Sequence, residues 1–280
     1  RVGSRVMPEG PEIRRAADQI EQVLRGKKLV RVEFGLDHLI PCAAQLKGRR
    51  VRAIDTHGKA MLTRFDNGLT LYTHNQLYGR WYVGDADLRP GTKRKLRVAL
   101  ITKDSAALLY SASTIELLTD AQIQQHPFLS KLGPDVLHAS TDVERVLQQL
   151  QNPAFKKRRL GYLLTDQTCL AGLGNYLRCE ALFDASLHPS LRPIDCTDEQ
   201  LTKLAQSLLI LARQSYKTAG ITNDVLRSKA LMSSGSTFEQ ARFLVFRRDG
   251  LPCYRCSQTI IKTTVSGQAC YSCAQCQSAG

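Results

Sequence analysis

The sequence lacks any apolar run long enough to cross a membrane. A membrane-spanning helix needs about 18 consecutive apolar residues, and no stretch of this 280-residue chain approaches that length, although 43% of its residues are hydrophobic. Residues 1–30 carry charges of both signs throughout, unlike a signal peptide. No internal repeat is evident. We therefore expect a cytoplasmic protein without a membrane partner.

Acidic residues are scarce relative to basic ones. Asp and Glu number 25 against 39 Lys and Arg, which gives a formal charge of +14. This surplus favours a polyanionic partner such as nucleic acid over a small neutral substrate, because a charge that serves only solubility is usually smaller. The basic residues gather in three clusters, Lys93–Arg97, Phe155–Arg159 and Phe246–Arg248. Each cluster alone is typical of a solvated face.

The N-terminal part has the pattern of one helix followed by short strands. From Gly10 to Gly26 apolar residues recur at helical spacing, with Pro11 in the first turn and Gly26 at the C-terminal cap. Seven short segments rich in Val, Ile, Leu, Tyr and Phe follow, near 29–34, 51–57, 60–66, 69–75, 79–83, 95–102 and 106–112. This spacing predicts a β-sandwich or barrel with the helix laid against it.

After Thr119 the pattern becomes helical. The predicted helices cover roughly 141–151, 158–170, 174–184 and 197–214. The stretch 215–240 is poor in large apolar residues and contains the sequence SSGS, so it is predicted to be a mobile loop.

Five of the nine cysteines lie within the last 28 residues. Four of them form two C-x2-C pairs separated by sixteen residues: Cys253, Cys256, Cys273 and Cys276. Four thiolates at these spacings can close a tetrahedral zinc site around a β-hairpin. With no open coordination position, the single Zn²⁺ is expected to be structural. Disulfides are the alternative, and Cys270 fits neither pair and is interpreted as a small packing residue.

Two further stretches have alternative readings. In Leu170–Leu182 a Gly-rich turn precedes a helix with Asn175 at or near its N-cap, so its N–H groups could hold a phosphate oxygen; an ordinary helical core is the alternative. In His74–Arg80 the consecutive side chains of Gln76, Leu77 and Tyr78 could fill the gap left by a base that leaves a duplex. The alternative is a purely structural role, as the end of a hairpin with Leu77 in the core.

Five motifs occur in a familiar order: MPEGPE from Met7, THGKA from Thr56, HNQLYG from His74, AGLGNYLR from Ala171, and the four cysteines. Together they resemble the formamidopyrimidine-DNA glycosylase and endonuclease VIII family, and more closely its endonuclease VIII branch, from Met7 to about Gln277.

The resemblance implies a multi-domain α+β fold. It consists of an N-terminal β-sandwich with a leading helix, a helix-two-turn-helix domain and a C-terminal β-hairpin zinc finger, with DNA bound between the two main parts. The boundaries that we expect are a leader or tag with the initiator methionine over 1–7, the catalytic sandwich over 8–125, the helical domain with its mobile loop over 126–240, and the zinc finger over 241–277.

The resemblance also implies a bifunctional DNA glycosylase and abasic-site (AP) lyase of base excision repair. It would act, as a monomer associated with the bacterial nucleoid, on double-stranded DNA containing oxidised pyrimidines or abasic sites. Pro8 would attack C1′ through its N-terminal amine, and α-amines with pKa values of about 7.7–8.0 suit this role better than lysines near 10.4. Glu9 would move protons, with Glu12 better suited to stabilising the helix N-terminus, and Lys59 would assist β-elimination.

DNA contacts follow from the same resemblance. Gln76 matches a DNA-contacting glutamine and forms the insertion wedge with Leu77 and Tyr78, while Asn175 matches a phosphate-binding asparagine. Lys131 stands where an arginine is expected, which keeps the charge but loses bidentate geometry.

Two features depart from the family pattern. Gln268 stands where the family has an arginine that binds phosphate and assists δ-elimination, so we expect β-elimination to survive and δ-elimination to be slowed. The residues RVGSRV precede Met7, and with them attached Pro8 is an amide nitrogen that cannot form an iminium. We expect this leader to be an appended remnant or a misplaced start, with the functional chain beginning at Pro8.

Two other functions stay open. One is a glycosylase of the same family directed at 8-oxoguanine or formamidopyrimidine. The other is a non-catalytic, zinc-dependent protein that binds damaged DNA without cutting it.

Overall fold

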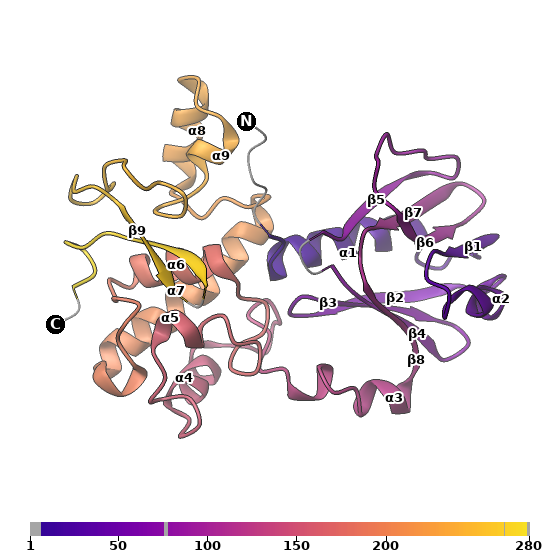
Figure 1. Ribbon diagram of the computed structural model, residues 1–280, viewed down its shortest axis with the longest axis horizontal. Helices are drawn as coiled ribbons and strands as arrows, with labels where there is room; N and C mark the ends of the chain where they lie inside the picture. Colours follow the sequence, from indigo (N-terminus) through magenta and orange to yellow (C-terminus); the bar gives the residue numbers. More distant parts are fainter. Residues whose placement is uncertain (1–6, 76–77, 266, 279–280) are drawn as a thin grey trace. The chain divides into compact units, whose positions relative to one another are not determined.

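The chain forms two compact units in the computed structural model, which describes residues 7–75, 78–265 and 267–278 (Figure 1). Among the described residues, unit 1 holds Met7, Pro8 and Glu12–Lys131. Unit 2 holds Glu9–Pro11 and the residues from Leu132 onward. The chain therefore passes from one unit to the other between Pro8 and Glu9, between Pro11 and Glu12, and between Lys131 and Leu132. Pro8 and Glu9 are the neighbouring residues for which the resemblance implies catalytic roles.

Unit 1 is a sandwich of two antiparallel four-stranded sheets. The first has the order β1 (Arg31–Phe34), β6 (Leu96–Ile101), β7 (Ser105–Tyr110), β5 (Arg80–Asp85). The second has the order β2 (Val51–His57), β3 (Ala60–Phe65), β4 (Leu69–His74), β8 (Thr114–Thr119). Short helical elements complete the unit: η1 (Ile40–Cys42), α2 (Ala43–Leu46), α3 (Asp120–Gln124) and η2 (Leu129–Lys131).

The predicted helix and strands are confirmed, with one strand added. The helix α1 spans Gly10–Leu24, and Gly26 just beyond it adopts φ +74° while its N–H donates to the Val51 carbonyl, as a C-terminal cap requires. All seven predicted strands are present. Strand β8 was not predicted because its sequence, TIELLT, mixes leucines and a glutamate that also favour helices.

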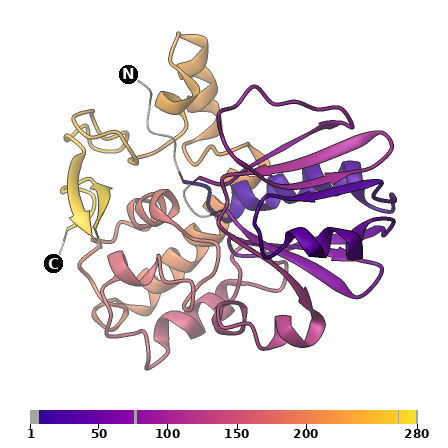
Figure 2. The same cartoon turned by 45° about the vertical axis from the view of Figure 1, so that its right-hand side comes forward.

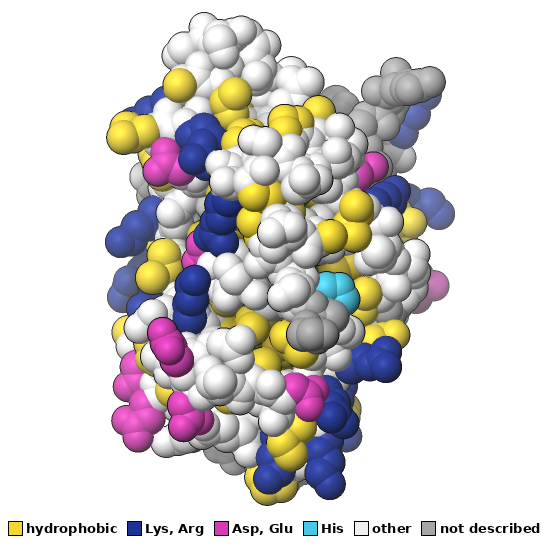
Figure 3. Space-filling view, turned by 90° about the vertical axis from the view of Figure 1, so that its left-hand side faces the viewer, with side chains coloured by type: hydrophobic (Ala, Val, Ile, Leu, Met, Phe, Trp, Pro, Cys, Tyr) yellow, Lys and Arg dark blue, Asp and Glu magenta, His cyan; other side chains and the backbone are white. Residues whose placement is uncertain are grey.

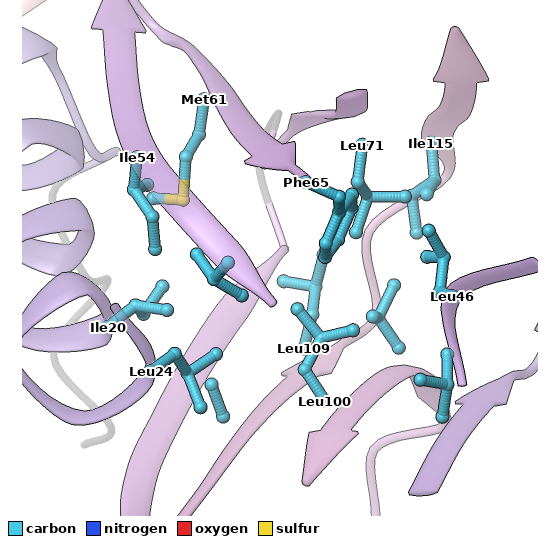
Figure 4. Close-up of a cluster of buried hydrophobic side chains, with 14 of the residues drawn as sticks. Ile20, Leu24, Leu46, Ile54, Met61, Phe65, Leu71, Leu100, Leu109 and Ile115 are labelled. Carbon is cyan, nitrogen blue, oxygen red and sulfur yellow. The ribbon is translucent and has the colours of Figure 1, made fainter. Parts of the chain in front are cut away.

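Helix α1 and both sheets share one hydrophobic core (Figure 4). From α1 come Ile20 and Leu24, which are fully buried against side chains of the strands. The second sheet contributes Ile54, Met61, Phe65 and Leu71, and the first contributes Leu100 and Leu109. Burial of each such side chain is worth about 1.5–3 kcal/mol, so the helix is a structural part of the sandwich.

Unit 2 is helical and ends in a hairpin, seen in yellow at the edge of the unit in Figure 2. Its helices are α4 (Val143–Gln151), α5 (Leu160–Leu163), α6 (Asn175–Asp184), η3 (Pro193–Asp195), α7 (Asp198–Lys217), α8 (Val225–Ser233) and α9 (Phe238–Ala241), and its strands are β9 (Ile261–Val265) and β10 (Gln268–Ser272). Helix α6 packs against both α7 and β10. Among the described residues, no helix combines the length and hydrophobicity that crossing a membrane requires.

The prediction of a loop over 215–240 is wrong, because α7 continues to Lys217 and α8 and α9 follow. Polar contacts order this stretch where large apolar side chains are few. The buried side chains of Asn223 and Ser228 both donate to the Ala241 carbonyl, each at 2.9 Å. Asp224 caps α8 by accepting from the Arg227 N–H. Hydrogen bonds of this kind leave no apolar periodicity in the sequence.

The predicted helix over 158–170 is mostly wrong as well. Only Leu160–Leu163 is helical, as α5. The Asp166 carboxylate accepts hydrogen bonds from the N–H and the hydroxyl of Thr168 at 2.9 and 2.7 Å. Such a local side-chain contact competes with the helical hydrogen bond and favours a turn.

The fully buried carboxylate of Glu180 ties α6 to the segment that follows α9. Its Oε2 accepts from the Thr222 hydroxyl and the Leu244 N–H at 2.6 and 2.7 Å, and its Oε1 accepts from the N–H groups of Val245 and Phe246, both at 2.8 Å. A buried charge is tolerated only with such partners. The Glu180 carboxylate therefore accepts four hydrogen bonds that link α6 to other segments of unit 2.

Replacing Glu180 with glutamine should destabilise unit 2 by on the order of 3 kcal/mol, because an amide nitrogen would face N–H donors that then lose their acceptor. Urea unfolding followed by circular dichroism measures the loss. The exposed Glu199→Gln in the first turn of α7 is the matched control and should change stability by less than about 0.5 kcal/mol. Equal stability of the two variants would contradict the role assigned to Glu180.

Candidate nucleic-acid interface

The side chain of Glu9 is buried at the N-terminus of α6. Its Oε2 accepts from the N–H groups of Gly174 and Leu177 at 2.7 and 3.3 Å, and its Oε1 accepts from the Tyr176 N–H at 2.8 Å. These are N–H groups that the first turn of a helix leaves without intrahelical partners. The expectation that they hold a phosphate oxygen is wrong, because the Glu9 carboxylate occupies them.

The two glycines of the AGLGN motif allow this close approach. A Cβ atom on Gly174 would lie 2.4 Å from the carboxyl carbon of Glu9. Gly172 adopts φ +96°, where other residues are strained, and its carbonyl accepts from the Gly10 N–H at 2.8 Å. The motif therefore allows the segment around Glu9 to pack closely against the start of α6.

Asn175 lies at the first position of α6 and contacts the hairpin. Its Nδ2 donates to the Ala269 carbonyl at 2.9 Å, which places Asn175 beside the strand that carries Gln268. An amide carries two N–H bonds, so this contact leaves a second one for a ligand. The Oε1 atom of Gln268 is buried and accepts no hydrogen bond from any described residue.

Arg178 is the largest fully buried side chain of the described residues, and sequence reasoning missed it. Its guanidinium donates to the Gly161 carbonyl at 2.9 Å and to the Oδ1 atom of Asn175. Its Nε is buried without a partner among the described residues. The spacing of three residues from Asn175 in AGLGNYLR, one turn of a helix, was the available signal. Arg178 orients the Asn175 amide so that its nitrogen faces the hairpin.

The four paired cysteines come together at one end of the hairpin. The sulfur atoms of Cys253, Cys256, Cys273 and Cys276 all lie within 4.8 Å of one another, with 3.9 Å between those of Cys253 and Cys276 and 3.4 Å between those of Cys256 and Cys273. A tetrahedral zinc ion with Zn–S bonds of about 2.3 Å requires sulfurs about 3.8 Å apart. None of these cysteines is in a disulfide. The residues present therefore fit a zinc ion.

Lys59 lies in the tight turn between β2 and β3, where His57 pairs with Ala60. Nearby, at the end of β4, His74 pairs with Ala60 and Thr114. Burial, reinforced by the positive charge of Lys59, lowers the pKa of His74 to about 4. The imidazole is therefore neutral at pH 7, and Lys59 carries the positive charge of this pair.

The other predicted site residues of unit 1 are placed as follows. Pro8 is partly buried. Gln76 and Leu77 lie outside the described residues. Tyr78 is 66% exposed and its carbonyl accepts from the Arg94 guanidinium. Lys131 is exposed at the end of η2.

A basic groove of about 580 Å³ adjoins Tyr78, and it was not predicted. Its lining residues are Tyr78, Thr92, Lys93, Arg94, Lys95, Arg97 and Ser111. The Lys93–Arg97 cluster, typical by sequence of a solvated face, thus forms the wall of a concave surface. A cationic groove with an exposed aromatic ring at its edge suits a nucleic-acid strand.

Basic side chains are also visible on the surface drawn in Figure 3. Figure 3 shows Lys and Arg spread across the visible surface, whereas Asp and Glu gather mainly toward its lower left. This distribution agrees with the formal charge of +14.

Comparisons with known proteins agree with this geometry. Residues 7–113 match the formamidopyrimidine-DNA glycosylase N-terminal domain, and residues 132–225 match the formamidopyrimidine-DNA glycosylase H2TH domain. Proteins named endonuclease 8 from Klebsiella pneumoniae and Escherichia coli are each 48% identical over 271 residues, and the one from Salmonella arizonae is 49% identical. Each alignment covers 97% of this chain and the whole relative.

Solved structures share the fold at lower identity. The Lactococcus lactis Fpg protein in complex with tetrahydrofuran-containing DNA and an inhibitor superposes with a TM-score of 0.79 at 22% identity, covering 96% of this chain and 99% of that one. A complex of the same protein with DNA containing an abasic site gives the same values.

The depressed pKa of His74 predicts a loss of stability in acid. Because the folded-state pKa of about 4 lies below the unfolded value of 6.5, the unfolded chain binds the proton first, and stability falls as the pH drops from 6.5 toward 4. The depressed pKa of His74 should lower the free energy of unfolding by about 2 kcal/mol between pH 7 and pH 5.

The variant His74→Gln should lack that part of the acid-induced loss. Denaturant unfolding followed by the fluorescence of Trp81, the single tryptophan, reports on unit 1. The exposed His38→Gln is the matched control and should lose stability as the parent protein does. An unchanged pH dependence in His74→Gln would overturn the assignment.

Proposed function

The chain belongs to the formamidopyrimidine-DNA glycosylase and endonuclease VIII family, and we propose that it removes oxidised pyrimidines from double-stranded DNA. It is a DNA glycosylase with AP lyase activity in base excision repair. The observation that carries the pyrimidine preference is the identity of 48–49% with endonuclease 8 over essentially the whole chain. The tyrosine at position 78, with the Gln76 and Leu77 that precede it, supports the same branch.

We propose Pro8 as the nucleophile. Its secondary amine attacks C1′ of the damaged nucleotide, the base leaves with a proton, and an iminium joins the enzyme to the opened sugar. Loss of a proton from C2′ then expels the 3′ phosphate by β-elimination, with Lys59 moving protons in this step. This chemistry requires a free amine, so the residues before Pro8 must be absent from the active protein.

Glu9 is the proposed proton carrier beside Pro8. Its three hydrogen bonds to the N-terminus of α6 hold the carboxylate in one orientation, and catalytic groups work best when so positioned. The same contacts give Glu9 a structural role. Glu9 has both roles because it is next to the proposed nucleophile in the chain and is hydrogen-bonded to α6.

The proposed DNA contacts come from both units. In unit 1, Gln76, Leu77 and Tyr78 act as the insertion wedge, and the basic groove beside Tyr78 takes backbone phosphates. Lys131 adds an exposed cation. In unit 2 the second N–H of the Asn175 amide binds a phosphate.

We further propose one structural zinc ion on the four cysteines and a monomeric protein. The functional regions are the sandwich over 8–125, the helical domain over 126–240 and the zinc finger over 241–277. The zinc ion would cross-link the four cysteines and take no part in catalysis, because four thiolates fill a tetrahedral coordination shell.

A preference for 8-oxoguanine or formamidopyrimidine is the second candidate, and the formamidopyrimidine named in the descriptions of the two matching domains favours it. Incision of duplexes containing thymine glycol or 8-oxoguanine, measured side by side, separates the two preferences.

A chain that begins at Pro8 should form a covalent adduct with DNA containing thymine glycol when borohydride reduces the iminium. The matched control is the chain that begins at Arg1, whose Pro8 nitrogen is an amide and should give no adduct. Intact mass confirms each start, and gel electrophoresis detects the adduct. The absence of an adduct from the shorter chain, with DNA binding retained, would favour a non-catalytic damage-binding protein instead.

Gln268 should leave the reaction largely at β-elimination, with an unsaturated aldehyde at the 3′ end. The variant Gln268→Arg should raise the share of 3′-phosphate product by on the order of tenfold, equivalent to about 1.4 kcal/mol, since a charged donor stabilises the leaving phosphate more strongly. The exposed Gln258→Arg controls for charge alone. A mainly 3′-phosphate product from the unaltered protein would contradict this prediction.

A further inference from the structure

Two buried thiols meet where α6 packs against β10. Cys179 lies on α6 and Cys270 on β10, and each side chain is only 1% exposed. Their sulfur atoms are 3.9 Å apart. The sequence analysis interpreted Cys270 as a packing residue outside the zinc pairs, and the catalytic proposal uses neither Cys179 nor Cys270.

The two thiols have unequal surroundings. The Cys179 thiol donates a hydrogen bond to the sulfur of Cys270, which lowers the pKa of Cys270 against the opposing effect of burial. The buried guanidinium of Arg178 lowers it further. Burial raises the pKa of Cys179 well above its ordinary value. Cys270 is thus the more acidic sulfur of the pair, and reaction with peroxide favours the sulfur that loses its proton more readily.

We propose that Cys179 and Cys270 are a site of reversible oxidation, at which a peroxide converts the two thiols into a disulfide. The Cys270 thiolate attacks one oxygen of hydrogen peroxide, which gives a sulfenic acid and, after protonation of the leaving hydroxide, water. The Cys179 sulfur then attacks the sulfenic sulfur and releases a second water. The two thiols lose two electrons and two protons, and the peroxide is reduced to two molecules of water.

Closing the bond needs only a small movement. A disulfide has an S–S length of about 2.05 Å, so the sulfurs must approach by roughly 2 Å. The hairpin can supply this shift because β9 and β10 form a two-stranded sheet whose β9 side chains are largely exposed, and such a sheet is only marginally stable by itself. Local opening of the hairpin from α6 also lets a small oxidant reach the pair.

The disulfide would tether the hairpin to α6 independently of zinc. In the reduced protein, the side-chain contacts near this point include the hydrogen bonds from Asn175 to Ala269 and from the Tyr271 N–H to the Cys179 sulfur at 3.5 Å. A covalent bond beside them would keep β10 on α6 after the metal is removed. Oxidation of this pair involves none of the residues proposed for DNA chemistry.

Peptide mapping tests the proposal on the zinc-loaded chain. After treatment with one equivalent of hydrogen peroxide and blocking of the remaining thiols, mass spectrometry should find one cross-linked peptide pair joining Cys179 to Cys270, with zinc retained and reversal by dithiothreitol. Neither Cys179→Ser nor Cys270→Ser should give a cross-link. The matched control is Cys169→Ser, a buried thiol elsewhere in unit 2, which should cross-link as the parent protein does.

Limited proteolysis after zinc chelation gives a second measurement. The oxidised parent protein should lose its hairpin on the order of tenfold more slowly than the reduced one, and Cys270→Ser should show no such difference. Peroxide that first releases zinc by oxidising the four paired cysteines would overturn the proposal. So would peroxide that carries Cys270 to the sulfinic acid while Cys179 stays reduced.

Discussion

The candidate site depends on the hydrogen bonds between the Glu9 carboxylate and the backbone N–H groups at the N-terminus of α6. A buried anion needs several donors, and the first turn of a helix offers N–H groups that nothing else in the helix uses. Three of them bind Glu9. Because Pro8 precedes Glu9 directly, the position of the proposed nucleophile is tied to this contact, and the glycines of AGLGN are explained by it.

Four further side chains of helix α6 make specific contacts. Asn175 contacts the hairpin backbone, Arg178 orients Asn175, Cys179 faces Cys270, and Glu180 binds the segment after α9. Every one of these side chains is polar or contains sulfur, and Arg178, Cys179 and Glu180 are fully buried. Alongside its buried apolar side chains, the helix therefore provides unit 2 with a set of buried hydrogen bonds that have specific directions.

Patterns local in the sequence predicted much of this structure. Short segments rich in Val, Ile, Leu, Tyr and Phe identified seven strands, and the cysteine spacing anticipated the cluster at 4.8 Å. Several of the failures depend on partners distant in the chain. Asn223 and Ser228 order a polar stretch through the carbonyl of Ala241, and the donors before α6 are taken by a residue 165 positions earlier. The groove beside Tyr78 likewise needed the folded loop to turn a charge cluster into a concave surface.

The bond between Arg94 and Tyr78 has a consequence for how the molecule could be altered. The guanidinium binds the main-chain carbonyl at position 78 and makes no use of the phenol ring, so the anchor does not depend on which side chain stands there. The side chain at position 78 can therefore be replaced while the hydrogen bond from Arg94 to the backbone is kept. Relatives or engineered descendants could exchange this ring for another shape, and so change which bases they probe, without rebuilding the loop that carries it.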